Sequence, residues 1–335
     1  MLRESRTALS SGAGSVLLYI VFVIVLLSCF AAGAASQAMA ALSLSERLSE
    51  QLQAAYVARG AVQVAVLTLA RDDTPAFDGL TDGWAYSPGI FAEQRMAGGT
   101  FRVTSGVTAQ GARRWGLADE ERRVNLNTAP PEWLKRLFIA AAGVREREAE
   151  DLAAAIADWR DPDTDERSGG AERFYYQSLR DAYDCKDGPF ENVEELLLLR
   201  GMTPAVYRAI EPLVTVHSIG PINLNTAGET VLRALGLSES GLAGFLLYRS
   251  GEDSAAGTPD DRQLTSIAGV ESELSAYVPA EDLARLAAMA QERLIVVFSK
   301  TFRMTATAEV RRPSSRAEVR SIIDRSGRVL HWQER

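Results

Sequence analysis

The stretch from Ser15 to Ser45 constrains this chain more than any other, because it contains no charged residue. Its first half, Val16 to Phe30, consists almost entirely of Leu, Ile, Val and Phe. An α-helix of about 20 apolar residues spans the ~30 Å hydrocarbon core of a membrane. Arg3 and Arg6 precede the run, and the first charge after it is Glu46. Positive charge in the short segment before the apolar run predicts a cytoplasmic N-terminus, with everything after about residue 40 outside the cytoplasm.

Three interpretations of this N-terminus are open at this point. A signal peptide would be cut after a small-residue site such as Ala38-Met39-Ala40. An uncleaved anchor would simply keep the run in the membrane. A pilin-type leader would be cut before the run, where Gly12 and Gly14 stand, so that the run stays on the mature protein.

The sequence after the run also has the composition and periodicity of a helix. Residues 36–70 contain no Pro and only one Gly, and they are rich in Ala, Leu and Gln, which are good helix formers. Apolar residues recur at three- and four-residue spacing, namely Leu44, Leu48, Leu52, Ala55, Val62, Val66 and Leu69. A single helix from Ser15 to about Leu69 would be roughly 80 Å long. A membrane helix followed by a separate amphipathic helix accounts for the same pattern.

Charge is unevenly distributed along the chain. The net charge is −8, whereas residues 125–290 alone carry −13, which leaves +5 for the remainder. This asymmetry indicates an inserted module and argues against non-specific nucleic-acid binding. Cys29 lies in the membrane run and Cys185 far outside it, so we expect no disulfide between them. Two histidines in the whole chain make a His-based metal site or catalytic triad improbable.

Strand patterns flank the acidic module on both sides. Residues 100–107 alternate apolar and polar side chains, and residues 113–124 are predicted as a second strand. Residues 301–310 alternate strictly, which places Phe302, Met304, Ala306, Ala308 and Val310 toward a core and Thr301, Arg303, Thr305, Thr307 and Glu309 outward. Residues 317–323 and 328–332 form a hairpin about Asp324-Arg325-Ser326-Gly327. A long helix with a small antiparallel sheet is an α+β arrangement, and here a helical insertion splits the sheet in sequence.

The insertion contains an internal repeat. Val124-Asn125-Leu126-Asn127-Thr128-Ala129 recurs as Ile222-Asn223-Leu224-Asn225-Thr226-Ala227. Each copy precedes a short predicted helix, at 133–138 and 231–235. We expect Thr128 to cap the first helix, and Thr226 with Glu229 to form a capping box on the second. Turns of Gly plus an apolar residue follow, at 143, 201, 236 and 269, so the module is predicted to be a set of helical hairpins.

An acidic loop inside the module is the candidate metal site. Asp161, Asp163 and Asp165 stand at the first, third and fifth positions of an EF-hand-type loop, and Glu172 stands at the twelfth. The sixth position, where that loop has Gly, is Glu166. Calcium takes six to eight oxygen ligands, which this spacing can supply, and a solvated acidic turn explains it equally. A second patch, Asp181, Asp184, Asp187 and Glu191, offers further ligands.

Taken together, these motifs resemble one family over nearly the whole chain: protein K of the type II secretion system, a minor pseudopilin. The segments that carry the resemblance lie almost entirely in the acidic module. They are Asp119-Glu120 with 124–129, then 158–163, 170–172 with Tyr175, Pro189-Phe190, 194–196, 200–202 and the second copy at 222–227.

The resemblance implies a pilin-like fold with a large all-α domain inserted in its sheet. The leader would occupy residues 1–14, the transmembrane and amphipathic helix 15–70, the pilin-like body 71–124 and 291–335, and the insertion 125–290. It implies calcium in the insertion, which favours Asp161, Asp163, Asp165 and Glu172 as ligands.

The resemblance also implies processing by the prepilin peptidase and methylation of the new N-terminus. The cut would fall between Gly14 and Ser15, or alternatively after Gly12. Tyr19 then takes the fifth mature position, where most pilins have Glu. The protein would be a non-enzymatic inner-membrane subunit, crossing once, with its C-terminal part in the periplasm. Its implied place is the pseudopilus tip, with the minor pseudopilins I, J and H and the major pseudopilin as partners.

Two other classes compete with this interpretation. The repeats also resemble helix-hairpin-helix modules, which would make the chain a membrane-anchored periplasmic protein for DNA binding or uptake. Those hairpins use paired glycines to reach a phosphate, whereas each hairpin here has a single glycine. A module with a net charge of −13 would also repel a phosphate backbone. A membrane-anchored enzyme would need a nucleophile and base, and no such motif is present in the sequence.

Overall fold

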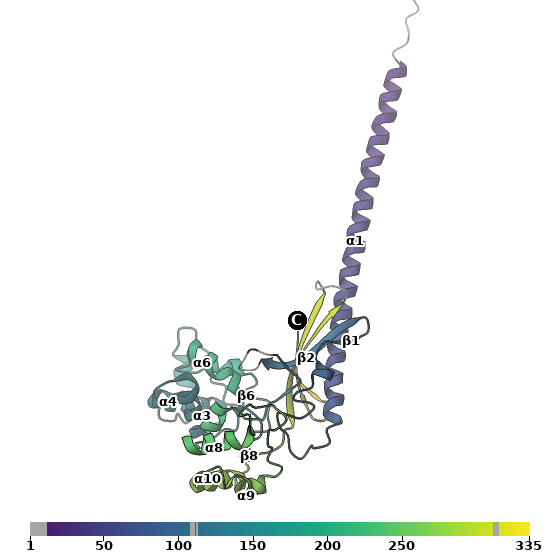
Figure 1. Ribbon diagram of the computed structural model, residues 1–335. Helices are drawn as coiled ribbons and strands as arrows, with labels where there is room; N and C mark the ends of the chain where they lie inside the picture. Colours follow the sequence, from purple (N-terminus) through teal and green to yellow (C-terminus); the bar gives the residue numbers. More distant parts are fainter. Residues whose placement is uncertain (1–11, 108–110, 112, 311–314) are drawn as a thin grey trace, which may run out of the picture.

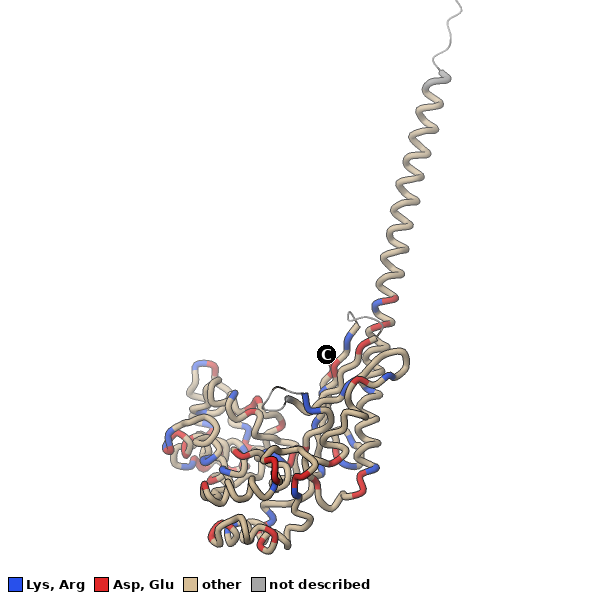
Figure 2. Tube along the Cα trace, in the orientation of Figure 1, with Lys and Arg blue, Asp and Glu red and all other residues tan. Residues whose placement is uncertain are grey.

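The computed structural model describes residues 12–107, 111, 113–310 and 315–335. Its dominant element is α1, Gly12–Ala70, one unbroken helix of 59 residues (Figure 1). The prediction of a single long helix is confirmed, and the alternative of two separate helices is wrong. The far half of α1 projects away from the rest of the molecule and carries no charged residue (Figure 2). Within the described residues, Ser15–Ala70 is the one helix long and apolar enough to cross a membrane.

The near half of α1 packs on an antiparallel sheet with the strand order β1–β2–β9–β10–β11. These strands are β1 Gln94–Met96, β2 Gly99–Val107, β9 Thr301–Val310, β10 Arg316–Asp324 and β11 Val329–Glu334. Two shorter strands join them, β3 Arg113–Trp115 beside β2 and β4 Ala118–Asp119 beside β9, and a short helix, α2 Pro88–Phe91, precedes β1. Strands β2 and β9 are neighbours although the whole insertion separates them in sequence, so the sheet is split as predicted.

Small side chains on α1 allow the helix to lie close to the sheet. Ala54, Ala58, Ala61 and Ala65 are fully buried against it. The predicted inward face of β9 is confirmed, because all five of its apolar residues are buried: Phe302, Met304, Ala306, Ala308 and Val310. The hairpin prediction is also confirmed, since β10 and β11 pair around a turn closed by Gly327 at φ 87°.

Two predictions about the sheet are wrong in detail. Thr301 and Thr307 were expected to face outward, and both are buried. Thr301 is covered by the segment that follows β4, because its N–H donates to Glu121 and its carbonyl accepts the N–H of Glu120. The second strand does not run from 113 to 124, because Gly116 breaks it at φ 149°, where a Cβ would lie 2.4 Å from the carbonyl oxygen of Ala85.

The insertion is mainly helical and contains the predicted hairpins. Its longer helices are α3 Pro131–Ala142, α4 Glu146–Arg160, α6 Pro204–Ile210, α8 Glu239–Arg249 and α10 Ala280–Gln291. The shorter elements are α5 Arg173–Gln177, η1 Val193–Leu198, η2 Glu211–Leu213, α7 Glu229–Ala234, η3 Ile267–Gly269 and α9 Val270–Leu274. The insertion is not all-α, because β5 Val124–Asn125 pairs in parallel with β6 Val214–Thr215, and β7 Ile222–Asn223 with β8 Ile295–Val296.

The predicted helix caps are wrong in both copies of the repeat. Helix α3 begins after Pro130 and α7 begins after Gly228, and neither has a side-chain cap. Instead Thr226 Oγ1 donates to Asp119 Oδ2 at 2.7 Å. The threonine therefore joins the insertion to the sheet rather than satisfying its own helix.

The two copies use their residues in the same way, which identifies a structural duplication. The second Asn of each copy exchanges a pair of hydrogen bonds with the backbone of a distant residue: Asn127 with Phe190 and Asn225 with Leu264. The last residue of the second helix, Arg160 or Arg249, donates to two carbonyls of its own copy. Each unit thus closes on itself through one side-chain amide and one guanidinium.

A cluster of buried polar side chains, which we term the junction, connects the insertion to the sheet. Asp119 Oδ2 accepts from Thr226 Oγ1 and from Ser299 Oγ at 2.6 Å. Asp78 Oδ2 accepts the N–H of Ser299, and Asp78 Oδ1 pairs with Arg325 of the C-terminal hairpin. The remaining members are Glu120, Glu121, Thr215, Asn223 and Arg303.

Replacing Asn225 with alanine should destabilise the folded chain. The change leaves the buried N–H and carbonyl of Leu264 without partners, and each orphaned group costs about 1–3 kcal/mol. We expect the free energy of unfolding to fall by roughly 2–4 kcal/mol, measured by urea titration of the full chain in detergent. Gln291→Ala, at an exposed helix end, is the matched control and should change it by less than about 0.5 kcal/mol. Equal stability of the two variants would contradict the assigned role of Asn225.

Candidate metal centre

The site lies where α4 ends and the acidic loop begins. Leu152, Ile156 and Trp159 anchor the helix in the core of the insertion, which fixes the position of its last turn. Asp158 in that turn is fully buried, and Arg167 from the loop donates to its Oδ1 at 2.8 Å and also pairs with Asp161. Gly170 packs against the same carboxylate, since a Cβ there would lie 1.9 Å from Asp158 Oδ2. The loop is therefore folded back over the end of the helix.

Folding the loop back brings three of the four predicted ligands together. One carboxylate oxygen from each of Asp161, Asp163 and Glu172 lies within 4.8 Å of the others. Asp165 is exposed, is absent from the group, and donates its backbone N–H to Asp163 Oδ1 at 3.0 Å. The third and fifth positions of the loop thus form a local turn, to which Asp165 contributes its backbone N–H and Asp163 its carboxylate.

Glu172 is the most informative residue of the group. It is 2% exposed, yet neither of its carboxylate oxygens has a hydrogen-bond partner among the described residues. Asp161 Oδ1 and Asp187 Oδ1 are likewise buried without a hydrogen-bond partner among the described residues. A buried carboxylate without a partner is costly, and coordination of a divalent cation removes that cost. The donor set is therefore suited to a hard cation such as calcium.

The electrostatics of Glu172 support the same conclusion. Burial, and to a smaller extent the charges of Asp158, Asp187 and Asp161, together raise the pKa of its carboxyl to about 7. A carboxyl with such a pKa is only partly ionised at neutral pH, and a bound cation would favour the ionised form. Asp161 and Asp163 would share the ion with Glu172.

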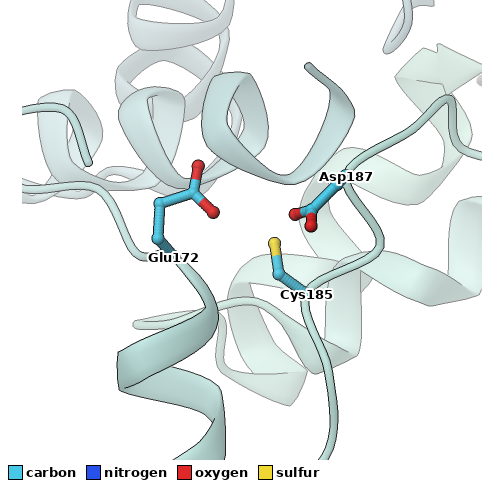
Figure 3. A group of neighbouring side chains, drawn as sticks. All are labelled: Glu172, Cys185 and Asp187. Carbon is cyan, nitrogen blue, oxygen red and sulfur yellow. The ribbon is translucent and has the colours of Figure 1, made fainter. Parts of the chain in front are cut away.

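A second group adjoins the first and shares Glu172. Its ligand atoms, from Glu172, Cys185 and Asp187, also lie within 4.8 Å of one another (Figure 3). Asp187 belongs to the second acidic patch noted in the sequence, and Cys185 was not recognised there as a possible ligand. Its position two residues before Asp187, within that patch, is the one sequence signal for it. Asp184 of the patch instead accepts from Gln177 at 2.8 Å.

The predicted processing site lies in the first turn of α1. Gly12 begins the helix, and the Gly14–Ser15 bond follows without a break. Tyr19 is 71% exposed on the same helix. Residues 1–11 of the predicted leader lie outside the described residues.

Fold and site together define a class: a membrane-helix subunit with a pilin-like body and an inserted helical domain that carries an acidic loop. Residues 116–218 match the family described as type II secretion system (T2SS), protein K. The chain is 28% identical to type II secretion system protein K of Pseudomonas aeruginosa, over 66% of this chain and 67% of that one. It is 24% identical to the protein of that name from Klebsiella pneumoniae, over 95% and 94% of the two chains.

Among solved structures, the chain is similar to one from the GspK-GspI-GspJ complex of the type 2 secretion system of enterotoxigenic Escherichia coli. The TM-score is 0.62 at 18% identity, and the match covers 88% of this chain and 98% of that one. The resemblance to type II secretion system protein K that was seen in the sequence is therefore confirmed.

The metal-free chain should lose stability as pH rises through about 7. The pKa of Glu172 is raised from 4.5 to about 7 in the folded state, so its contribution to stability is fully present below about 4.5 and is lost as the carboxyl ionises near 7. Thermal unfolding of chelator-treated protein between pH 5 and 8 measures this loss. Glu172→Gln, which does not titrate, should flatten the profile, and saturating calcium should reverse the decline. An unchanged profile in Glu172→Gln would contradict the assignment.

Proposed function

We propose that the chain is a minor pseudopilin of the type II secretion system. It stands at the tip of the pseudopilus, where it initiates assembly with the minor pseudopilins I, J and H and supports export of folded proteins across the outer membrane. The observation that carries this proposal is the apolar face that α1 leaves uncovered from Leu44 onward. Its homology to protein K and its fold, which matches a chain of the GspK-GspI-GspJ complex, support the partners I and J.

The uncovered face of α1 follows helical spacing. Leu44, Leu48, Leu52 and Tyr56 recur every four residues and so share one side of the helix, and each is more than half exposed. The opposite side, with Ala54, Ala58 and Ala61, is covered by the sheet. A continuous stripe of large apolar side chains outside the membrane is typical of a protein interface. Helices of neighbouring subunits, including the major pseudopilin, are its natural partners.

Two features support a terminal position in the fibre. A Glu at the fifth mature position of a pilin is thought to pair with the terminal amine of a neighbouring subunit, and this chain has Tyr19 there. A subunit at the tip has no subunit above it that requires the pairing. The insertion projects to one side of the body (Figure 1), and its bulk would block further subunits from adding on top.

The remaining assignments follow from the same account. The prepilin peptidase cuts between Gly14 and Ser15, or after Gly12, and α1 then holds the subunit in the inner membrane with its body in the periplasm. The domain boundaries fall at residues 71, 125 and 291, as the sequence suggests. Its role is non-enzymatic. It binds no nucleic acid, since residues 125–290 carry a net charge of −13. Calcium, held by Asp161, Asp163 and Glu172, has a structural role in closing the acidic loop.

Leu52→Asp should separate assembly from folding. Leu52 is 61% exposed, so its replacement should change the free energy of unfolding by less than about 0.5 kcal/mol. A carboxylate in an apolar helix interface should nevertheless reduce the recovery of minor pseudopilins I and J, and with it the secretion of exported protein. The measurement is co-purification from detergent-solubilised membranes of cells that express the whole system. Leu52→Met, which keeps apolar volume, is the control and should behave as wild type. Full recovery of I and J with Leu52→Asp would refute the proposed interface.

A further inference from the structure

Strand β11 forms one edge of the sheet, because β10 is its only neighbour among the described strands. The register against β10 is regular over residues 319–322, and Arg335 exchanges both backbone hydrogen bonds with Glu318. In an antiparallel ladder the hydrogen-bonded pairs alternate along each strand. The backbone N–H and C=O groups of Trp332 and Glu334 therefore point away from β10, toward the open edge.

This edge lacks the usual protection against pairing with another chain. Lys, Pro and inward-pointing charges normally occupy exposed edge strands. Strand β11 contains neither Lys nor Pro, and its carboxylate, Glu334, is already paired with Arg59 of α1 at 2.8 Å. Val329, Leu330 and Trp332 are each more than a third exposed. An apolar edge with free backbone groups is a template for an added strand.

A groove of about 870 Å³ borders the same edge, between the sheet and the insertion, which stand side by side in Figure 1. Its floor is the face of the sheet turned away from α1, to which β11 contributes His331 and Gln333. Its wall is η1, where Leu197 and Leu198 are nearly half exposed. The rings of His217 and His331 lie 5.6 Å apart, so the insertion comes close to the strand. A strand added to β11 would direct alternate side chains into this groove.

The charges that line the groove favour a basic occupant. Both of its arginines and one of its carboxylates are already paired within the chain: Arg303 with Glu120, Arg320 with Glu318, and Glu195 with Lys186. Glu194 and Glu211 also line the groove, are exposed, and form no ion pair within the part of the chain that the structure describes. A Lys or Arg of an occupant would complement these two carboxylates.

We propose that the β11 edge and this groove together bind an extended polypeptide segment of a protein outside the fibre, which adds to the sheet as a further strand. The segment would carry apolar side chains at alternate positions and a Lys or Arg facing Glu194 and Glu211. Hydrogen bonds to the backbone of Trp332 and Glu334 would supply affinity, and the groove would select the side chains. The inference rests on the proposed function in one respect only: helix packing on α1 leaves the opposite face of the sheet open.

The test uses the full chain in detergent and a fluorescein-labelled peptide, Val-Thr-Lys-Thr-Val-Thr-Val, whose Val and Lys side chains share one face of a strand. Fluorescence anisotropy measures its binding, and the comparison peptide has Glu in place of Lys. We expect saturable binding of the lysine peptide and binding at least about tenfold weaker for the glutamate peptide, because like charges oppose each other. Absence of saturable binding, or equal binding of the two peptides, would overturn the proposal.

Two variants test the role of the strand edge. Trp332→Pro removes an N–H that points away from β10, so the ladder with β10 is kept, and Pro is tolerated at such edge positions. It should weaken peptide binding by at least about tenfold, since it removes a backbone donor and blocks strand addition. Trp332→Phe keeps the N–H and an aromatic side chain and is the matched control. Unchanged binding by Trp332→Pro would overturn the assigned edge.

A measurement on the unaltered chain does not depend on how a variant folds. Hydrogen–deuterium exchange of residues 328–335 should slow when the lysine peptide is bound, and unchanged exchange would overturn the proposal. If the chain without peptide self-associates in light scattering, and Trp332→Pro abolishes this, the occupant is a second copy and the assigned partner is wrong. Because these measurements use the isolated subunit, full recovery of I and J with Leu52→Asp would refute the α1 interface and leave this inference standing.

Discussion

The rest of the structure depends on the junction, where charged and polar side chains are buried between two apolar cores. One core lies under α1 and the sheet, and the other fills the insertion. Apolar contact is not directional, so by itself it would let the insertion settle on the sheet in many ways. Asp119 lies just before the insertion and accepts hydrogen bonds from Thr226, in the second copy of the repeat, and from Ser299, just before β9. It therefore connects the start of the insertion, its second repeat and the segment that returns to the sheet. These hydrogen bonds define one orientation.

The two copies of the repeat differ in the loop that follows the second helix. In the second unit, the loop after Arg249 closes on itself, because Asp260 Oδ2 accepts the N–H groups of Glu252 at 2.7 Å and Asp253 at 3.1 Å. In the first unit, the loop after Arg160 is longer, and both carboxylate oxygens of the buried Glu172 lack a hydrogen-bond partner among the described residues. Backbone amides satisfy the carboxylate in one copy, and a cation would do so in the other.

Much of this architecture was predictable from periodicity, and the misses have physical reasons. The helix α1 and the inward face of β9 follow local patterns that tertiary contacts reinforce. Thr226 fits a capping box by spacing, but a buried Asp119 offers it a stronger, charge-assisted hydrogen bond. No local pattern indicates Asp119 as the partner of Thr226, because the two residues lie about a hundred residues apart in the sequence. The position of Cys185 beside Glu172 was missed for the same reason, since folding alone brings the two residues together.

The central claim is that α1 stays on the mature protein as a pilin-type helix. The most direct test is mass spectrometry of the mature N-terminus, from cells with and without the prepilin peptidase. The account predicts a methylated Ser15, or Ala13 if the cut follows Gly12, that appears only when the peptidase is present. A chain that keeps Met1, or one that begins near Ala41, would contradict it, because the first is a simple anchored protein and the second has lost the helix.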